Sequence, residues 1–322
     1  MTTRTFPRRL SAAALVLAAA LPLSACGGES GASSEPSTSG TADAAFPRTV
    51  VHAMGSTEIA ERPERVVVLD TGELDSALAL GVTPIGAVTT DVSSGFLSYL
   101  AEGAADVEMV GTIGEPNLEA IAALRPDLIL SNKVRHEDLY EDLARIAPTV
   151  FAEKVGAAWK DNYRLAAEAL GREEEAESAL ADYEQAAADL GASLGDPAGT
   201  RVSPLRFVQG SVRVYSPESF IGTVLTDVGL SLVELPAGES PTFTELSPEQ
   251  LTLADADVLL YSSYGEPGDS GEDAVRGGPL WSRLPVVAEG RASEVEDDVF
   301  YTGIGLGAAR LIVERLGEVL AS

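Results

Sequence analysis

The stretch Arg172–Leu194 reads REEEAESALADYEQAAADLGASL and divides the chain into two parts. Apolar or small residues recur along it at helical spacing, among them Ala176, Leu180 and Leu190, while most positions between them are acidic. This pattern predicts one amphipathic helix with a packed face and a solvated face. At about 1.5 Å per residue, such a helix is roughly 35 Å long.

Two stretches on either side of this predicted helix share a pattern. Residues 117–130 read NLEAIAALRPDLIL, and residues 246–261 read LSPEQLTLADADVLLY. In each, a glutamate opens a short helix, and an aspartate eight positions later opens an apolar β run. The pairs are Glu119 with Asp127 and Glu249 with Asp257. The repetition predicts two related lobes, although helix-then-strand units also recur by chance in α/β proteins.

The first residues form an export signal. Three arginines precede an apolar run from Leu10 to Leu21, which is too short to count as a membrane-spanning helix. The run ends in Leu23-Ser-Ala-Cys26, which resembles the bacterial lipobox, where signal cleavage leaves a lipid-bearing N-terminal cysteine. Cys26 is the only cysteine of the chain, so an intrachain disulfide is excluded. We expect a lipid anchor on the extracytoplasmic face of the cell membrane, with general and twin-arginine export both open.

Composition then sets the domain boundaries. The segment after the signal is rich in Gly, Ser and Thr and lacks the apolar content to fold, which is typical of a flexible tether. The remaining residues suffice for two lobes with their own cores. We expect a signal peptide at 1–25, a tether at 26–45, an N-terminal lobe at 46–170, a spacer helix at 171–196 and a C-terminal lobe at 197–322.

The net charge of −28 excludes whole classes of partner. Nucleic acid or an acidic membrane surface would be repelled over most of the protein, so any basic cluster stands out. The two histidines, His52 and His136, lie far apart in sequence and no cysteine is usable, so a zinc or manganese site is hard to build. We expect no metal site and no cofactor, and we expect His136 to be an ordinary surface residue.

The order of the elements predicts an α/β fold. A strand at 65–70, a helix at 74–80, a strand at 84–88 and the helix and strand of 117–130 give βαβαβ. This order favours a parallel sheet with helices on its faces. The C-terminal half repeats strands and helices and closes with a helix at 305–320. We therefore expect two α/β lobes with parallel-type sheets joined by one long spacer helix, and ligands at the carboxyl ends of the strands. In the first half these ends are residues 71–73, 89–91 and 131–135.

Two patterns match enzyme motifs but lack the context that those motifs need. Residues 191–195 read GASLG, which fits G-x-S-x-G, yet a helix ends there and a nucleophile elbow needs a strand before its serine. Neither histidine has the late position of a hydrolase triad. Residues 303–307 read GIGLG, but too little chain follows to complete a dinucleotide-binding unit. We expect a tight turn there with Thr302 as helix N-cap, and no enzyme activity.

Taken together, the lipobox, the two lobes, the spacer helix and the matched glutamates resemble the substrate-binding lipoproteins of ABC importers for iron-siderophores and cobalamin. The resemblance covers the chain from Cys26 onward. Its most specific stretches are residues 117–130, then KVRHEDLY at 133–140, IAPTV at 146–150 and WKDN at 159–162. They look like the subgroup that serves hydroxamate and citrate-hydroxamate ferric siderophores.

The resemblance implies a non-enzymatic, monomeric receptor that captures a ferric siderophore and hands it to an ABC permease. Iron would be held by the chelator and not by protein atoms. A cobalamin or haem carrier of the same fold stays open, and it would favour an apolar, aromatic cleft with fewer arginines. A surface-anchored hydrolase is the alternative from another class.

In this family one glutamate per lobe docks on arginines of the permease, and the matching positions are Glu119 and Glu249. Two carboxylates at helix starts, one on each lobe, can meet a two-fold related pair of basic pockets. A glutamate at a helix N-terminus also interacts favourably with the helix dipole without any partner.

The ligand site is expected between the lobes. A ferric siderophore presents oxygen atoms and often net negative charge, so an acidic protein needs a local basic and aromatic cluster. The candidates are Lys133, Arg135, Trp159, Lys160, Arg206, Arg213, Tyr215, Tyr264 and Tyr301. Arg135 follows a strand end, and Arg213 and Tyr215 share one face of their strand, so these three lead. For Lys160 a solvated helix position is an equal alternative. A rigid spacer helix should also limit lobe movement on binding.

Overall fold

The computed structural model describes residues 46–209, 211–236, 238–265 and 267–320, which belong to one compact unit. The predicted signal peptide, the lipobox cysteine Cys26 and the tether lie outside these residues. In the part of the chain that is described, no helix combines the length and the apolar character needed to cross a bilayer.

The N-terminal half contains a five-stranded parallel sheet in the order β5-β4-β3-β6-β7. Its strands are β3 (Val66–Val68), β4 (Gly86–Thr89), β5 (Glu108–Thr112), β6 (Leu128–Asn132) and β7 (Thr149–Ala152). Every residue of β3, β4, β6 and β7 is buried, as expected for strands covered on both faces. Edge strand β5 is partly exposed, so its sequence lacks the apolar run that identifies the others.

Short helices connect and cover this sheet. They are α1 (Thr71–Ala79), α2 (Leu118–Leu124), α3 (Lys133–His136), η1 (Glu137–Leu139), α4 (Tyr140–Ala144), η2 (Gly156–Ala158) and α5 (Trp159–Leu170). The hairpin of β1 (Arg48–His52) and β2 (Gly55–Ile59) is the strand pair at the start of the folded part. Polar side chains cap three of these helices. Asp70 caps α1 after the end of β3, Asn132 caps α3 at the end of β6, and Asn117 caps α2.

The C-terminal half contains a mixed sheet in the order β11-β9-β8-β12-β13, with β10 also paired to β8. The strands are β8 (Arg201–Val208), β9 (Ser211–Tyr215), β10 (Ser231–Leu232), β11 (Phe243–Leu246), β12 (Val258–Ser263) and β13 (Ala292–Glu294). Strands β8, β12 and β13 are parallel, whereas β9 runs antiparallel to both of its neighbours, β8 and β11. The connection between β8 and β9 is too short for a crossover helix, so this pair forms a hairpin within an otherwise parallel-type sheet.

Helices surround the second sheet as well. They are η3 (Pro197–Gly199), α7 (Phe220–Val228), η4 (Pro248–Ala254), α8 (Pro267–Ser270), α9 (Glu272–Arg276), η5 (Trp281–Arg283), α10 (Pro285–Ala288), the π-helical turn η6 (Asp298–Thr302) and α11 (Leu306–Leu320). We refer to each sheet with its covering helices as a lobe.

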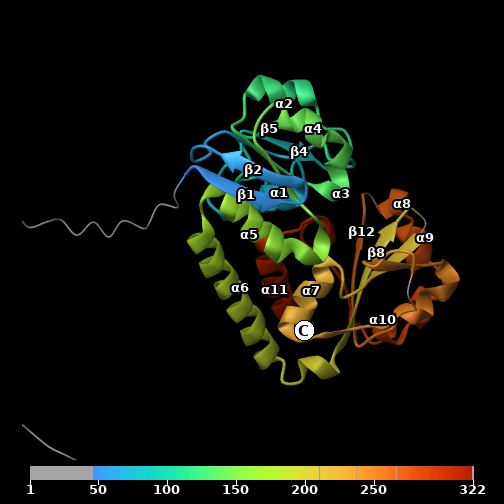
Figure 1. Cartoon of the computed structure of the whole chain (residues 1–322). Helices are drawn as coiled ribbons and strands as arrows, with labels where there is room; N and C mark the ends of the chain where they lie inside the picture. The colour runs from blue at the N-terminus through green and yellow to red at the C-terminus, as the bar shows by residue number, and fades with distance from the viewer. Residues whose placement is uncertain (1–45, 210, 237, 266, 321–322) are drawn as a thin grey trace, which may run out of the picture. The chain divides into compact units, whose positions relative to one another are not determined.

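The predicted spacer is one helix, α6 (Glu173–Ser193), and it packs along α5, α7 and α11 (Figure 1). Its buried positions are Ala176, Leu180, Tyr183, Ala187 and Gly191, which follow the helical spacing of the sequence. Because one hydrophobic core runs through the helices of both lobes, the lobes are packed together as well as covalently joined. The fold class is confirmed, while the lobe boundaries at residues 170 and 196 stay predictions.

Both enzyme-like glycine patterns have packing reasons. A Cβ on Gly191 would lie 2.1 Å from the carbonyl oxygen of Val228, so this glycine allows α6 to approach the end of α7. The hydroxyl of Ser193 donates to the Leu190 carbonyl at 2.7 Å, within the last turn of α6. The serine therefore lies at a helix end, as the sequence predicts.

The start of α11 corrects one prediction. Thr302 does not cap this helix, because its hydroxyl bonds with Asp297 instead. The first-turn N–H groups of Gly307 and Ala308 donate to the carboxylate of Asp75 in α1, at 2.8 and 3.0 Å. A Cβ on Gly305 would lie 2.5 Å from that carboxylate, so the glycine-rich turn makes room for a capping group from the other lobe.

Candidate ligand site

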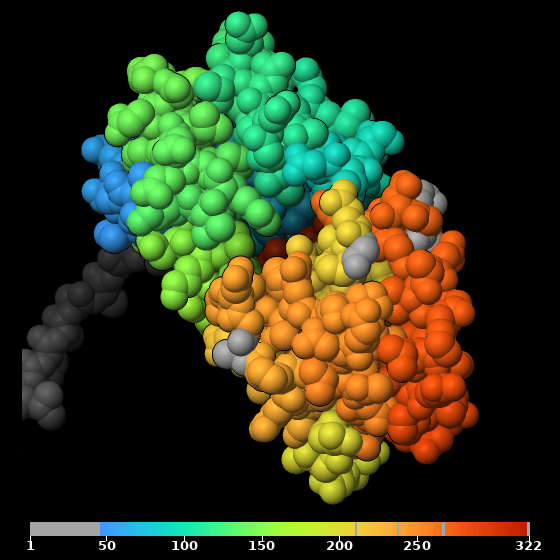
Figure 2. Space-filling view, turned by 90° about the vertical axis from the view of Figure 1, so that its right-hand side faces the viewer, coloured from blue at the N-terminus to red at the C-terminus, as the bar shows by residue number. Residues whose placement is uncertain are grey.

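A cavity of about 230 Å³ lies between the lobes and contains groups from both. Figure 2 shows the hollow between the blue-to-green and the yellow-to-red parts of the surface, with dark blue and dark red atoms at its floor. The lining residues are Asp70, Thr71, Thr90, Asp91, Ile113 and Arg135 from the first lobe and Arg206, Arg213, Tyr264, Tyr301, Thr302 and Ile304 from the second. The first set follows the carboxyl ends of parallel strands, where ligands of such sheets bind.

Two of the lining arginines are neighbours in the second sheet. Arg206 of β8 pairs with Arg213 of β9, and Arg213 pairs in turn with Glu245 of β11. Like charges directly opposite each other are unfavourable, so each guanidinium needs a carboxylate. The Nε atom of Arg213 donates to Glu245 Oε1 at 2.9 Å, and its guanidinium lies over the ring of Phe243 at 4.4 Å. The pairing of β8 with β9 therefore places the guanidinium groups of Arg206 and Arg213 on one face of the sheet.

Arg206 is the more deeply buried of the two. Its side chain is 9% exposed and donates to both carboxylate oxygens of Asp297 and to the hydroxyl of Thr302. It also stacks on Tyr264, with 4.3 Å between the guanidinium carbon and the ring centroid. Burial lowers the pKa of Arg206, but the hydrogen bonds and charge of Asp297 outweigh burial and the pKa is raised. This side chain is therefore a fixed part of the cavity wall.

Arg135 faces the cavity from the first lobe. Asn132 caps α3 by accepting from the Arg135 backbone N–H at 3.0 Å, and its Nδ2 donates to Asp70 at 2.9 Å. The Arg135 side chain is 42% exposed, and its Nε lies 3.3 Å from Asp70 Oδ2. Asp70 in turn caps α1, so the end of β3 and the end of β6 together orient this guanidinium.

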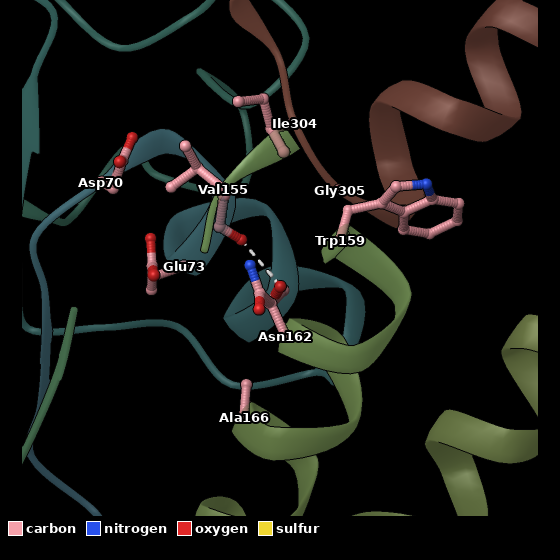
Figure 3. Close-up of a pocket in the computed structure, with 10 residues that line it drawn as sticks. Asp70, Glu73, Val155, Trp159, Asn162, Ala166, Ile304 and Gly305 are labelled. Atoms are coloured by element: carbon pink, nitrogen blue, oxygen red, sulfur yellow. Dashed lines mark hydrogen bonds between the residues drawn. The ribbon is translucent and has the colours of Figure 1, made fainter. Parts of the chain in front are cut away.

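Beneath Asp70 lies a second buried carboxyl, Glu73. Burial, and then the charge of Asp70, raise the pKa of Glu73 to about 8, so it keeps its proton at neutral pH. Both side chains border a small cavity of about 20 Å³, the size of one water molecule, together with groups of α5 and Ile304 (Figure 3). Glu73 therefore lies behind the ligand-facing wall of the first lobe, to which Asp70 itself belongs.

Five of the nine sequence candidates line the larger cavity, namely Arg135, Arg206, Arg213, Tyr264 and Tyr301. Tyr215 is not a lining residue but packs against one, with its ring centroid 5.1 Å from that of Tyr301. The three leading candidates therefore fall at or next to one cavity instead of on separate surfaces.

The structure does not bring the other three candidates to this cavity. Lys133 lies 3.6 Å from Glu153 and 4.0 Å from Glu137. Lys160 turns toward α6 and α7 and pairs with Glu184 and Asp227 at 3.1 and 3.0 Å.

Trp159 is buried in the shared core. Its indole N–H donates to Thr223 of α7 at 3.0 Å, and Figure 3 shows the ring directed away from Asp70 and Glu73. Because Trp159 and Lys160 begin α5, the packing of α5 against the second lobe determines their direction.

Other wall residues were not candidates from the sequence. Thr71, Thr90 and Asp91 lie in two of the predicted strand ends, so the strand-end rule alone was the available signal. The prediction that His136 is a surface residue is wrong. It is 2% exposed and bonds with Ser131 Oγ and the Ile113 carbonyl at 2.7 and 2.8 Å, and burial lowers its pKa.

The arrangement can hold oxygen-rich anionic groups. Arg135 and Arg213 each use Nε for an ion pair, and within the described residues no protein group bonds the terminal nitrogens of either side chain. Two guanidinium edges from different lobes are therefore available to a ligand. Among the described residues, no group of three or more His, Cys, Asp or Glu side chains is arranged to hold a metal ion.

The matched glutamates lie at equivalent places in the two lobes. Glu119 is exposed in the first turn of α2, and Glu249 is exposed in the first turn of η4. Their paired aspartates also correspond, because Asp127 accepts from the Arg65 N–H and Asp257 accepts from the Arg201 N–H, both at 2.9 Å. The two sequence repeats therefore form similar helix-then-strand units beside the central strands β3 and β8, with an α-helix in the first lobe and a 3-10 helix in the second.

Comparison with known proteins extends over both lobes. The family described as periplasmic binding protein matches residues 66–298. The chain is 38% identical over 321 residues to the probable siderophore-binding lipoprotein YfiY of Bacillus subtilis, covering 96% of this chain and 97% of that protein.

It is 29% identical over 271 residues to the Fe(3+) dicitrate-binding periplasmic protein FecB of Escherichia coli, covering 83% and 88%. Among solved structures, Staphylococcus aureus SirA complexed with staphyloferrin B superimposes with a TM-score of 0.75 at 30% identity, covering 85% of this chain and 98% of SirA.

Proposed function

The chain belongs to the periplasmic binding protein family, and from this premise we propose that it captures a ferric siderophore outside the cytoplasmic membrane and delivers it to an ABC importer. The relatives that support the proposal are named for siderophore or ferric citrate binding. The observation that carries it is the pair of guanidinium edges from Arg135 and Arg213, which reach one cavity from different lobes.

The chemistry of the cavity fits an anionic chelator with oxygen donors. A guanidinium presents N–H groups in a planar fork that matches carboxylate oxygens, and such charge-assisted hydrogen bonds are strong. Glu245 is 51% exposed, so a ligand oxygen can take its place on Arg213 while Glu245 turns to solvent. The chelator supplies the iron ligands, and the protein binds the outer oxygen atoms of the complex.

The remaining parts of the proposal depend on the sequence and on the family. We propose a lipid anchor on Cys26, a signal peptide at 1–25 and a tether at 26–45 that holds a monomeric receptor at the membrane surface. Lobes 46–170 and 197–322, joined by the spacer 171–196, carry Glu119 and Glu249 for docking on the permease. The relative YfiY is itself named a lipoprotein, which supports the anchor. The receptor performs no chemistry on its cargo.

Titration calorimetry with ferric citrate, ferric staphyloferrin B, a ferric trihydroxamate, the iron-free chelators, haem and cobalamin tests the proposal. We expect at least one ferric chelator to bind more tightly than haem and cobalamin. Arg135→Ala and Arg213→Ala should each weaken that binding about 10- to 100-fold, because each removes charge-assisted hydrogen bonds. Arg164→Ala is the control, since Arg164 pairs with Glu177 on the α5 and α6 surface.

Two results would contradict the proposal. One is a preference for haem or cobalamin over every ferric chelator. The other is wild-type affinity for the ferric ligand in both cavity variants, which would place the ligand elsewhere.

A further inference from the structure

A continuous line of contacts joins the arginines of the two lobes across the cavity floor. Its centre is Thr71, the first residue of α1, which is 5% exposed. The Thr71 hydroxyl lies 3.2 Å from the Thr302 carbonyl oxygen of the second lobe and 3.2 Å from Asp70 Oδ1 of its own lobe. The hydroxyl can donate to either acceptor, so it connects the two lobes at the cavity floor.

At each end of this line of contacts one arginine is bound: Arg135 by Asp70 in the first lobe, and Arg206 by Thr302 in the second. On the first lobe, Asp70 accepts from Thr71 N–H through Oδ1 at 2.7 Å and holds Arg135 Nε at 3.3 Å through Oδ2. On the second lobe, Arg206 donates to the hydroxyl of Thr302, whose carbonyl faces Thr71.

Arg206, at the second-lobe end of this line, is connected to the ligand-facing Arg213 by strand pairing. Arg206 is the cross-strand partner of Arg213, so the position of one constrains the position of the other. The contact between Thr71 and Thr302 therefore lies on the path of bonds from Arg135 to Arg213.

We infer that Thr71 is a positioning residue, whose hydroxyl sets the spacing between the guanidinium groups of Arg135 and Arg213 that grip the ferric ligand. The inference rests on the proposed function. Two guanidinium forks on separate lobes grip one ligand well only when their separation matches its oxygen atoms, and misplacements of a fraction of an ångström weaken such sites. Thr71 acts through its neighbours, because it is almost wholly buried and its hydroxyl already has protein acceptors.

Other contacts between the lobes stay intact when this one is removed. Asp75 accepts from the first turn of α11, and Asp298 accepts from the Ser98 N–H at 2.7 Å. The indole of Trp159 donates to Thr223 at 3.0 Å. Removing one neutral hydroxyl should therefore leave the lobes packed and the fold intact, while the local geometry of the cavity floor loosens.

The test compares Thr71→Val, which removes the hydroxyl at nearly constant volume, with Thr71→Ser, which keeps it. Thr149→Val is the matched control, since Thr149 is equally buried, its hydroxyl donates to the Ala147 carbonyl at 2.9 Å within the first lobe, and it does not line the cavity. The probe is the ferric chelator that wild type binds most tightly among ferric citrate, ferric staphyloferrin B and a ferric trihydroxamate. Thermal melting checks that each variant is folded.

We expect Thr71→Val to weaken binding about 3- to 10-fold, as befits the loss of one neutral hydrogen bond, and Thr71→Ser to return affinity to within about twofold of wild type. Thr149→Val should stay within about twofold of wild type. In the Arg135→Ala background, Thr71→Val should add less than about twofold, because the group that it positions is absent.

Unchanged affinity in Thr71→Val would overturn the inference, and so would equal losses in Thr71→Val and Thr149→Val. A full loss from Thr71→Val in the Arg135→Ala background would mean that the hydroxyl touches the ligand directly, which also overturns it. Failure of wild type to bind any ferric chelator would instead refute the proposed function, so the two failures are distinguishable.

Discussion

Replacing Asp75 by asparagine should change how stability depends on pH. Asp75 lies in α1 of the first lobe, is 1% exposed and accepts hydrogen bonds from the N–H groups of Gly307 and Ala308 in α11. The hydroxyl of Tyr99 donates to it at 2.9 Å. Burial raises the pKa of Asp75 to about 6, although these three donors oppose the rise.

The size of the effect follows from this shift. As pH rises above 3.8, the unfolded chain releases the Asp75 proton first, whereas the folded protein retains it up to about pH 6. The contribution of Asp75 to stability therefore falls as pH rises through this window and stays constant above it. At about 1.4 kcal/mol per pH unit, the total loss is about 3 kcal/mol. Asparagine has no proton to release, so this loss is absent in Asp75→Asn.

The assay is urea unfolding of wild type and Asp75→Asn at pH 4, 5, 6 and 7, followed by circular dichroism. The stability of the variant minus that of wild type should increase by about 2 kcal/mol between pH 4 and pH 7, because a small part of the loss has already occurred at pH 4. Subtraction removes the contribution of the many other carboxyl groups, which both proteins share. Asp75→Ala serves as a second variant, because it leaves two backbone donors of α11 without an acceptor and should lose about 2–5 kcal/mol at every pH.

A pH-independent difference between wild type and Asp75→Asn would refute the reasoning about burial. Equal stability of Asp75→Ala and wild type would refute the capping role of Asp75 across the lobes.

Three further predictions follow from the same structure. The raised pKa of Glu73 means that wild type loses stability as pH rises from about 4.5 to 8, and Glu73→Gln should lack this loss when both are unfolded in urea over that range; parallel curves would contradict it. Glu119→Ala and Glu249→Ala should each reduce siderophore uptake by cells several-fold while calorimetric ligand affinity is unchanged, with exposed Glu174→Ala as control; normal uptake in the double variant would rule out docking through these residues. Solution scattering should show nearly the same radius of gyration with and without ferric ligand, because one core runs through both lobes, and a large closure would contradict this expectation.

The sequence predicts those features that depend on neighbours along the chain. The periodicity of Arg172–Leu194 identifies α6, and the apolar runs identify β3, β6 and β12, because burial of a helix face or a whole strand leaves a local pattern. The matched glutamate and aspartate pairs also fold alike, since each pair lies within one helix-then-strand unit.

The site is only partly predictable. The alternation along β9 correctly places Arg213 and Tyr215 on one face. It does not show that Arg206 lies beside Arg213, since that neighbour depends on strand pairing. Lys160 has the composition of a ligand-binding group, yet α7 packs against it and supplies Asp227 as its partner.

By itself, then, the sequence determines the α/β class, the spacer helix, the order of the buried strands β3, β4 and β6 along the chain and the edge at which the first lobe presents polar groups. The tertiary structure alone decides which of those groups meet. Arg206 pairs with Asp297, 91 residues away, and Thr71 reaches Thr302, 231 residues away. Such contacts depend on how the sheets and helices pack, and local spacing carries no information about a partner that distant.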